Sequence, residues 1–198
     1  MVNTSCAASH PWLPSHATLD MFRVVKLPSK VTFILGGAAS GKSAFAESLC
    51  LSSGKDRVYL ATSQVFDDEM RAKIDRHLHQ RGTGWTTHEA PMDLAPVLDS
   101  LAADQICLVD CATMWLSNQM LAEADLQAAQ HDLLDALQRC PAEVVVVSNE
   151  VGHGIVPDNA LARQFREAQG RLNIALAGMA DRAVLVTAGL PQVLKGTL

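Results

Sequence analysis

The stretch from Gly36 to Ser43 constrains this chain more than any other, because it reads Gly-Gly-Ala-Ala-Ser-Gly-Lys-Ser and fits the spacing Gly-x-x-x-x-Gly-Lys-Ser/Thr. An apolar run at residues 31–35 precedes it, and a segment with helical character at residues 44–50 follows. Glycines let the main chain approach a phosphate group without a Cβ atom in the way, so that backbone N–H groups can wrap the anion. The stretch therefore predicts a phosphate-binding loop between a strand and a helix, in preference to an ordinary glycine-rich turn.

The residues of this loop have different predicted roles. We expect Lys42 to contact the β- and γ-phosphates of a nucleotide and the Ser43 hydroxyl to bind Mg²⁺, while the positive end of the helix that opens at Lys42 attracts the same anion. Asp110 follows the apolar run at 106–109, and one aspartate at the end of a buried strand is typical of the metal-side carboxylate in phosphate-loop enzymes. The predicted nucleotide-binding residues of the loop are Gly36, Gly37, Ala38, Ala39, Ser40, Gly41, Lys42 and Ser43. The predicted metal ligands are Ser43 and Asp110, and the predicted catalytic lysine is Lys42.

Apolar runs alternate with helical segments along the rest of the chain. Beyond the strand before the loop, strands are predicted at 58–61, 106–110, 143–148 and 183–187, with a short extended piece at 85–89. Helices are predicted at 42–52, 67–80, 93–101, 113–121, 126–139 and 159–179. This alternation predicts an α/β fold of the three-layer, P-loop NTPase-like (RecA-like) type. It has about five core strands in a mostly parallel sheet flanked by helices, and Gly189 begins a closing turn.

Polar residues follow the second predicted strand, at Thr62, Ser63 and Gln64. Open parallel sheets bind ligands at the edge where the strands end, so these hydroxyls and this amide are candidate nucleotide contacts, although a polar turn fits the residues equally well. Glu89, after the extended piece at 85–89, can accept hydrogen bonds from a base or ribose, with a solvated carboxylate as the alternative.

His77 lies on the helix predicted at 67–80, at the edge of a stripe formed by Ile74 and other apolar residues. Arg76, His79 and Arg81 surround it in sequence. Like charge lowers the pKa of an imidazole and keeps it neutral and nucleophilic, and a cationic rim favours phosphate. From the residues alone, however, a surface histidine fits His77 better.

The composition indicates a single globular domain. With 198 residues, of which 48% are hydrophobic and 19% charged, the chain is long enough to bury about 70% of its unfolded surface. We assign residues 30–198 to one P-loop nucleotide-binding domain. Residues 1–29 have prolines but no helical or strand period, and we expect a flexible extension there.

The net charge, the cysteines and the hydropathy of the chain limit which partners it can bind and in which compartment it is expected. The net charge of -5 argues against a nucleic-acid surface. Five cysteines without a Cys-x-x-Cys pair indicate reduced thiols, most of them in the core. No apolar run approaches the roughly 18 residues of a membrane span, and the N-terminus lacks the pattern of a secretory signal. We therefore expect a cytoplasmic protein.

Several segments together resemble one family, the bifunctional adenosylcobinamide kinase/adenosylcobinamide-phosphate guanylyltransferase of cobalamin biosynthesis. The resemblance covers roughly residues 31–196, and its more specific parts are Ile-Asp-Arg-His at 74–77 and Ser-Asn-Glu-Val-Gly at 148–152. The other matching segments are the loop at 36–43, Tyr-Leu-Ala-Thr-Ser-Gln at 59–64, Asp-Asp-Glu-Met at 67–70, Arg81, Trp85, Val-Asp-Cys at 109–111, Trp-Leu-Ser-Asn at 115–118, the continuation of the Ser-Asn-Glu segment to Pro157, and Ala-Gly-Leu-Pro at 188–191.

The resemblance implies two reactions. The first is phosphorylation of the adenosylcobinamide hydroxyl by ATP or GTP, and the second is transfer of GMP from GTP to that phosphate with release of pyrophosphate. It also implies that His77 carries GMP covalently, which reverses the interpretation as a surface histidine, and that the protein is a homotrimer with sites between subunits. The GTP contacts that it implies are Thr62, Ser63, Gln64, Leu78, His79, Gln80, Arg81, Glu89 and Asp110.

The chain departs from the family pattern at two informative positions. Ala39 stands where the family commonly has arginine, which removes a phosphate-facing guanidinium, and His153 stands where an apolar residue is usual. Two other interpretations of the phosphate loop remain: a small-molecule kinase without a histidine intermediate, and a nucleotide-switched binding protein without transfer chemistry.

Overall fold

The computed structural model describes residues 30–64 and 83–197. The N-terminal extension and the helix predicted at 67–80 lie outside these residues. The strands are β1 (Val31–Gly36), β2 (Asp56–Ala61), β3 (Trp85–Glu89), β4 (Gln105–Asp110), β5 (Glu143–Asn149), β6 (Arg182–Thr187) and β7 (Leu190–Lys195). The helices are α1 (Lys42–Ser52), α3 (Ala95–Ser100), α4 (Ala112–Leu121), α5 (Leu126–Arg139) and α6 (Ala160–Met179).

The strands form one sheet in the order β3-β2-β4-β5-β1-β6-β7. Strands β1 to β6 pair in parallel, and β7 pairs with β6 in the antiparallel sense. Central β5 is buried over Val144 to Ser148, as expected for a parallel strand that is covered on both faces. The prediction of a mostly parallel sheet flanked by helices is confirmed.

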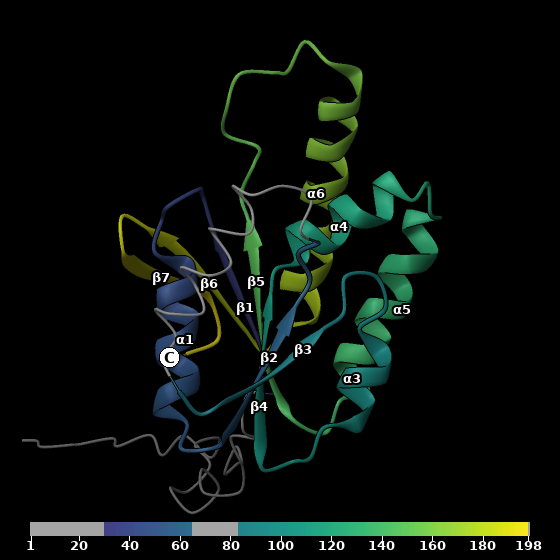
Figure 1. The fold of residues 1–198 in the computed structure, drawn as a ribbon. Coiled ribbons are helices and arrows are strands. Elements are labelled where there is room, and N and C mark those ends of the chain that lie inside the picture. The colour runs from purple at the N-terminus through teal and green to yellow at the C-terminus, as the bar shows by residue number, and fades with distance from the viewer. Residues whose placement is uncertain (1–29, 65–82, 198) are drawn as a thin grey trace, which may run out of the picture.

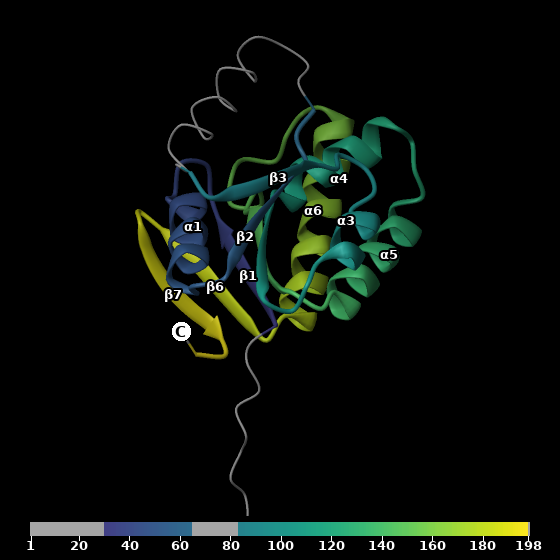
Figure 2. The ribbon, with the colours of Figure 1, turned by 60° about the horizontal axis from the view of Figure 1, so that its bottom comes forward.

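Helices cover both faces of the sheet (Figures 1 and 2). Helix α1 covers one face, where Ala46 and Cys50 pack against strand residues that include Ile34 and Leu108. Helices α3 to α6 lie on the other face, where Leu137 and other apolar side chains form the larger core cluster. The chain therefore has the predicted three layers, and the face that carries α1 is called the α1 face below.

One strand was not predicted. The described residues form seven strands: the five core strands expected, β3, which was predicted as a short extended piece at 85–89, and β7. Strand β7 was predicted as a closing turn, because all six of its residues are exposed and it contains Pro191, so it has no buried run. Proline is tolerated there because β7 is an edge strand.

The helices in the described part of the chain begin and end close to the predicted residues. Asp125 caps α5 by accepting hydrogen bonds from the backbone N–H groups of Gln127 and Ala128. Asn159 caps α6 through the N–H of Ala162. Helix α3 is shorter than predicted and covers Ala95–Ser100.

Three cysteines are fully buried core residues, as predicted from their number and spacing. Cys50, Cys107 and Cys140 each have an exposed fraction of 0% and are unpaired thiols. Burial raises the pKa of all three, that of Cys50 to about 12. These thiols therefore stay protonated at neutral pH and act as small apolar side chains. Within residues 30–64 and 83–197, none of the helices has the length and apolar character needed to cross a membrane.

Candidate nucleotide-binding site

The edge at which the parallel strands end is called the carboxyl edge. Gly36 and Asn149 pair at the ends of β1 and β5, and Ala61 pairs with both Glu89 and Asp110 at the ends of β2, β3 and β4. The register of the sheet therefore brings the phosphate loop, the polar tip of β2 and Asp110 to one edge, as the sequence predicted. It also brings Glu89 to this edge, a position that the sequence analysis did not assign.

The phosphate loop makes a tight turn between β1 and α1. Gly41 has a φ of 90° and Ala39 has a φ of 55°, and the first of these conformations is one that glycine adopts most easily. A Cβ atom on Gly36 would lie 2.7 Å from the carbonyl oxygen of Val186 and would also collide with the Ser40 hydroxyl. The glycine at position 36 is therefore required by space.

Two neighbouring segments brace the loop from outside. The Gly189 N–H, in the turn between β6 and β7, donates to the Ser40 carbonyl at 2.8 Å. The Glu150 N–H, just after β5, donates to the Gly36 carbonyl at 3.0 Å. The loop backbone is thus held at its first glycine and at its fifth residue, which leaves little freedom for its shape.

Lys42 and Ser43 form the first turn of α1. The ammonium group of Lys42 donates to the Gly37 carbonyl at 3.1 Å, so that its cation lies across the loop. Gly41 precedes the helix and provides no side-chain cap. The N–H groups of the first helical turn and the positive end of the helix therefore point to where an anion would bind.

Asp110 lies on the same face of the sheet as the start of α1. Strand side chains alternate, and Ile106 and Leu108 of the same strand pack into the cluster beneath α1, so Asp110 continues this row at the carboxyl edge. Its Oδ2 accepts a hydrogen bond from the Tyr59 hydroxyl at 3.3 Å. Ser43 and Asp110 thus bring two hard oxygen donors to one side of the sheet, which suits Mg²⁺.

The residue after Asp110 adds no negative charge to the site. Burial, and secondly the Asp110 carboxylate, raise the pKa of the Cys111 thiol to about 11. Among the described residues there is no cluster of three or more His, Cys, Asp or Glu side chains that would hold a metal by itself. This finding is compatible with Mg²⁺, which commonly takes only one or two protein ligands and completes its shell with phosphate and water.

Thr62 has a different position from its two neighbours. It is fully buried, its hydroxyl donates to the Cys111 carbonyl at 2.8 Å, and the Cys111 N–H donates to the same hydroxyl at 2.8 Å. Its own N–H donates to the Asp110 carbonyl at 3.3 Å. The side chain therefore ties the end of β2 to the end of β4, whereas Ser63 and Gln64 are half-buried and Glu89 is exposed.

The sequence analysis missed a buried polar network beneath the end of β5. The Ser148 hydroxyl donates to Asn173 Oδ1 at 2.7 Å, and the Gln169 amide donates to both of these atoms at 2.9 Å. The Asn149 N–H donates to the Thr113 hydroxyl at 2.8 Å, and the Asn173 amide donates to the Asn149 carbonyl at 3.1 Å. The network fixes the start of the loop that carries Glu150. In the sequence its only sign is that Gln169 and Asn173 interrupt the apolar stripe of α6.

His77, the predicted covalent nucleophile, lies outside the described residues, and so do four predicted nucleotide contacts. These are Leu78, His79, Gln80 and Arg81. The remaining predicted site residues, namely Gly36, Gly37, Ala38, Ala39, Ser40, Gly41, Lys42, Ser43, Thr62, Ser63, Gln64, Glu89 and Asp110, are all at or beside the carboxyl edge.

Comparison with known proteins gives three kinds of match. The sequence model of a family described as cobinamide kinase / cobinamide phosphate guanyltransferase matches residues 32–194. The bifunctional adenosylcobalamin biosynthesis protein CobP of Pseudomonas aeruginosa is 42% identical over 166 residues, which cover 82% of this chain and 96% of that protein. The bifunctional adenosylcobalamin biosynthesis protein CobU of Salmonella typhimurium is 41% identical over 178 residues, covering 82% of this chain and 98% of that protein.

A solved structure supports the fold. An ATPase from the type III secretion system of pathogenic bacteria superposes with a TM-score of 0.50 at 11% identity, over 83% of this chain and 56% of that one. At this identity the likeness concerns the fold alone.

The family match spans the phosphate loop, both strands that carry Glu89 and Asp110, and the loop after β5. The chain therefore belongs to the cobinamide kinase/cobinamide phosphate guanyltransferase family.

Proposed function

We propose that this enzyme phosphorylates adenosylcobinamide with ATP or GTP and then transfers GMP from GTP to adenosylcobinamide phosphate, which yields adenosylcobinamide-GDP. The observation that carries the proposal is a formed phosphate loop, with Lys42 bonded across it to Gly37, in a chain matched by the family from residue 32 to residue 194. Residues 30–198 form the catalytic domain in this proposal.

The phosphate loop supplies positioning and charge for the kinase step. Backbone N–H groups of the loop and of the first turn of α1 hold the phosphates, and Lys42 stabilises the charge that develops on the transferred phosphoryl group. Ser43 and Asp110 would hold Mg²⁺, which would supply further positive charge at the β- and γ-phosphates. Because Ala39 has no guanidinium, Lys42 is the cationic side chain of the loop itself.

For the second reaction we assign the nucleophile to His77. A neutral ring nitrogen attacks the α-phosphorus of GTP, an N–P bond forms, and the bond to the bridging oxygen breaks as pyrophosphate leaves. A phosphate oxygen of adenosylcobinamide phosphate then attacks the same phosphorus and breaks the N–P bond, which restores the imidazole. The position of His77 in the sequence, near Arg76, His79 and Arg81, supports this role. Positive charges nearby lower the pKa of an imidazole and so keep its ring neutral.

GTP labelled at the α-phosphate tests this mechanism. The wild-type protein is expected to form an acid-labile, alkali-stable adduct, and His77→Ala is expected to form none. His131→Ala is the matched control, because His131 is an exposed histidine on α5. An adduct that persists in His77→Ala would move the covalent step to another residue. The absence of any adduct in the wild type, together with transfer of the γ-phosphate, would replace this proposal by a simple kinase.

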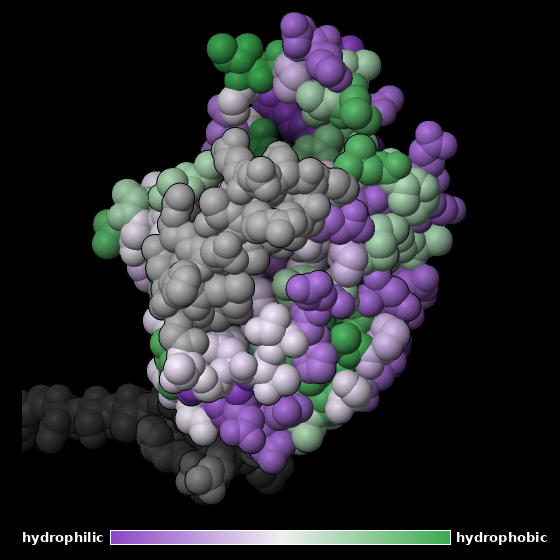
Figure 3. Space-filling view, viewed as in Figure 1, coloured by the Kyte–Doolittle hydropathy of each residue, from purple (hydrophilic) through white to green (hydrophobic). Residues whose placement is uncertain are grey.

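We also place this enzyme in the cytoplasm, as its reduced thiols indicate, and assign it a homotrimer. The segment between β5 and α6, with the first turns of α6, forms an arm that projects beyond the sheet (Figure 1). Figure 3 shows hydrophobic and hydrophilic surface side by side on this arm. Its exposed apolar residues are Ile155, Val156 and Leu161, which are 97%, 68% and 54% exposed. Arg166 donates to the Ile155 carbonyl at 3.1 Å and so holds the arm in shape. Exposed apolar side chains on a projecting arm fit the contact surface of a second subunit.

Sedimentation equilibrium tests the assembly. The wild-type chain is expected at three times the monomer mass, and Ile155→Asp is expected to shift it to monomer, since the charge would have to be buried without a partner. Ile174→Asp is the control, because Ile174 is an apolar residue in the C-terminal half of α6 that is also largely exposed, at 75%. A monomeric wild type, or equal dissociation by both variants, would contradict this assignment of the surface.

A further inference from the structure

Helix α4 inserts an asparagine between the ends of two strands. Asn118 is 3% exposed, and its amide nitrogen donates to the Thr62 carbonyl at 2.8 Å and to the Pro91 carbonyl at 2.9 Å. Thr62 directly follows β2, and Pro91 lies two residues after the end of β3. One side chain therefore ties together two segments that are far apart in the sequence.

The orientation of this amide is determined by its neighbours. Two carbonyl oxygens face it, so the NH₂ group must point to them, since a flipped amide would set oxygen against oxygen. The consequence is that Asn118 Oδ1, although buried, accepts no hydrogen bond among the described residues. A buried acceptor without a partner costs free energy. The two hydrogen bonds that the amide nitrogen donates offset this cost, and an apolar side chain could not make them.

The two bonds fix the backbone beside three predicted nucleotide contacts. Ser63 and Gln64 follow Thr62 in the chain, and Glu89 precedes Pro91 by two residues. The other polar groups of Thr62 bond to Asp110 and Cys111, so the end of β2 is held from both sides. The Ala90 N–H already donates to the Ala61 carbonyl at 2.9 Å, and the Asn118 side chain extends this link to Thr62 and Pro91, beyond the last paired residues of β2 and β3.

This part of the carboxyl edge is distant from the phosphate loop. In the strand order, β5 and β4 separate β1 from β2, and β3 lies beyond β2. With strands about 4.8 Å apart, the end of β2 lies roughly 14 Å along the edge from the end of β1. An extended nucleoside triphosphate has a comparable length, so phosphates at the loop bring the nucleoside toward β2 and β3. The loop itself is braced by Gly189 and Glu150 and does not depend on Asn118.

We propose that Asn118 is a positioning residue for nucleoside recognition: it aligns the ends of β2 and β3 so that their side chains meet the base and ribose, and it has no part in holding the phosphates. The inference rests on the proposed function, in that the site binds GTP. Asn118, the last residue of the Trp-Leu-Ser-Asn segment, is thereby assigned to the part of the site that recognises the nucleoside and not the phosphates.

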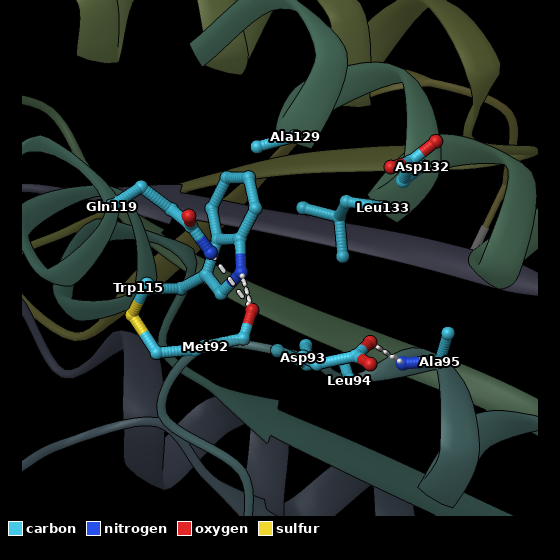
Figure 4. A pocket seen from close by; sticks show the side chains of 9 residues that line it. All are labelled: Met92, Asp93, Leu94, Ala95, Trp115, Gln119, Ala129, Asp132 and Leu133. Carbon is cyan, nitrogen blue, oxygen red and sulfur yellow. Dashed lines mark hydrogen bonds between the residues drawn. The ribbon is translucent and has the colours of Figure 1, made fainter. Parts of the chain in front are cut away.

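The neighbouring residue offers a matched control. Gln119 is 6% exposed and its amide donates to the Met92 carbonyl at 2.8 Å, in the same segment after β3. The Met92 carbonyl also accepts from the Trp115 indole at 2.8 Å, as the dashed lines in Figure 4 show. Loss of the Gln119 amide therefore leaves that carbonyl with a donor, whereas loss of the Asn118 amide removes a donor from two carbonyls at once.

The experiment compares GTP with inorganic tripolyphosphate, each with Mg²⁺, by titration calorimetry of the full chain. Asn118→Leu is expected to weaken GTP binding about tenfold, the size expected from losing one or two hydrogen bonds, with tripolyphosphate binding unchanged. In turnover the KM for GTP should rise by a similar factor while kcat stays within about threefold. Gln119→Leu should leave both ligands within about twofold of the wild type.

A second variant covers poor folding of the first. Asn118→Asp keeps the shape of the side chain. Burial against two carbonyl oxygens favours its neutral form, which can donate to only one of them, so it should show the same selective loss for GTP. Equal losses for GTP and tripolyphosphate, or no loss for GTP in a folded variant, would overturn the role of Asn118. Failure of the wild type to bind GTP would instead overturn the proposed function, so the two failures are distinguishable.

Discussion

Lys42→Met is expected to lower kcat of both reactions by about 10²- to 10³-fold, the usual cost of removing one charged group that stabilises a transition state. The ammonium group lies across the phosphate loop, bonded to the Gly37 carbonyl at 3.1 Å, at the positive end of α1. Methionine keeps the length and the apolar stem but removes the charge. Steady-state assays with adenosylcobinamide and with its phosphate, supplied separately, measure the two reactions.

Lys55→Met is the control for this prediction. Lys55 lies in the turn after the other end of α1, where it forms a salt bridge with Glu143 at 3.1 Å and donates to the Ala103 carbonyl at 3.0 Å. Its loss should cost no more than about 1 kcal/mol of stability and leave turnover unchanged, since it touches the opposite edge of the sheet. Comparable losses of kcat in both variants would mean that the charge of Lys42 acts through the fold and not on the phosphates.

Gly36→Ala is expected to reduce the free energy of unfolding by about 1 to 3 kcal/mol and to weaken GTP binding by more than about tenfold. The new methyl group would lie 2.7 Å from the Val186 carbonyl oxygen, in the backbone of the adjacent strand β6. Backbone cannot rotate away as a flexible side chain can, so β1 or the loop must shift. The shift would also disturb the Glu150 N–H bond to the Gly36 carbonyl. Urea denaturation and calorimetric titration with GTP measure the two effects.

Gly37→Ala is the control that distinguishes a steric clash at position 36 from a general effect of placing alanine in the phosphate loop. A Cβ atom on Gly37 would have no atom within 4 Å, and its φ does not lie in the left-handed region. Gly37→Ala should therefore leave the unfolding midpoint in urea close to that of the wild type. If Gly37→Ala destabilised the protein as much as Gly36→Ala, the contact with Val186 would not be the cause.

The strands and the phosphate loop were predictable because their physical signals are local. Buried parallel strands are continuous apolar runs, as at 143–148, and the loop requires its glycines at a fixed spacing. Asp110 was also predictable, since a carboxylate after such a run must emerge at the carboxyl edge. Its placement on the α1 face follows from alternation once Ile106 and Leu108 are known to pack beneath α1.

The features that the sequence did not predict depend on partners far along the chain. Strand β7 has no buried side and carries Pro191, so that only its pairing with β6 identifies it as a strand. Asn118 belongs to a matching segment, but nothing in its spacing shows that it bonds to residues 27 and 56 positions away. The same holds for Gln169 and Asn173, whose partners lie on β5. A polar residue on the apolar face of a helix indicates a buried hydrogen bond, but the sequence does not show which residue is the partner.

The hairpin of β6 and β7 has a practical consequence for handling the protein. Its turn touches the phosphate loop twice: the Gly189 N–H bonds to the Ser40 carbonyl, and the Gly189 Cα lies where a side chain on Gly41 would have to fit. A chain shortened before this turn would lose the outer strand and a support of the loop in a single cut. Affinity tags, fluorescent fusions and circular permutants should therefore preserve the last dozen residues in their native register.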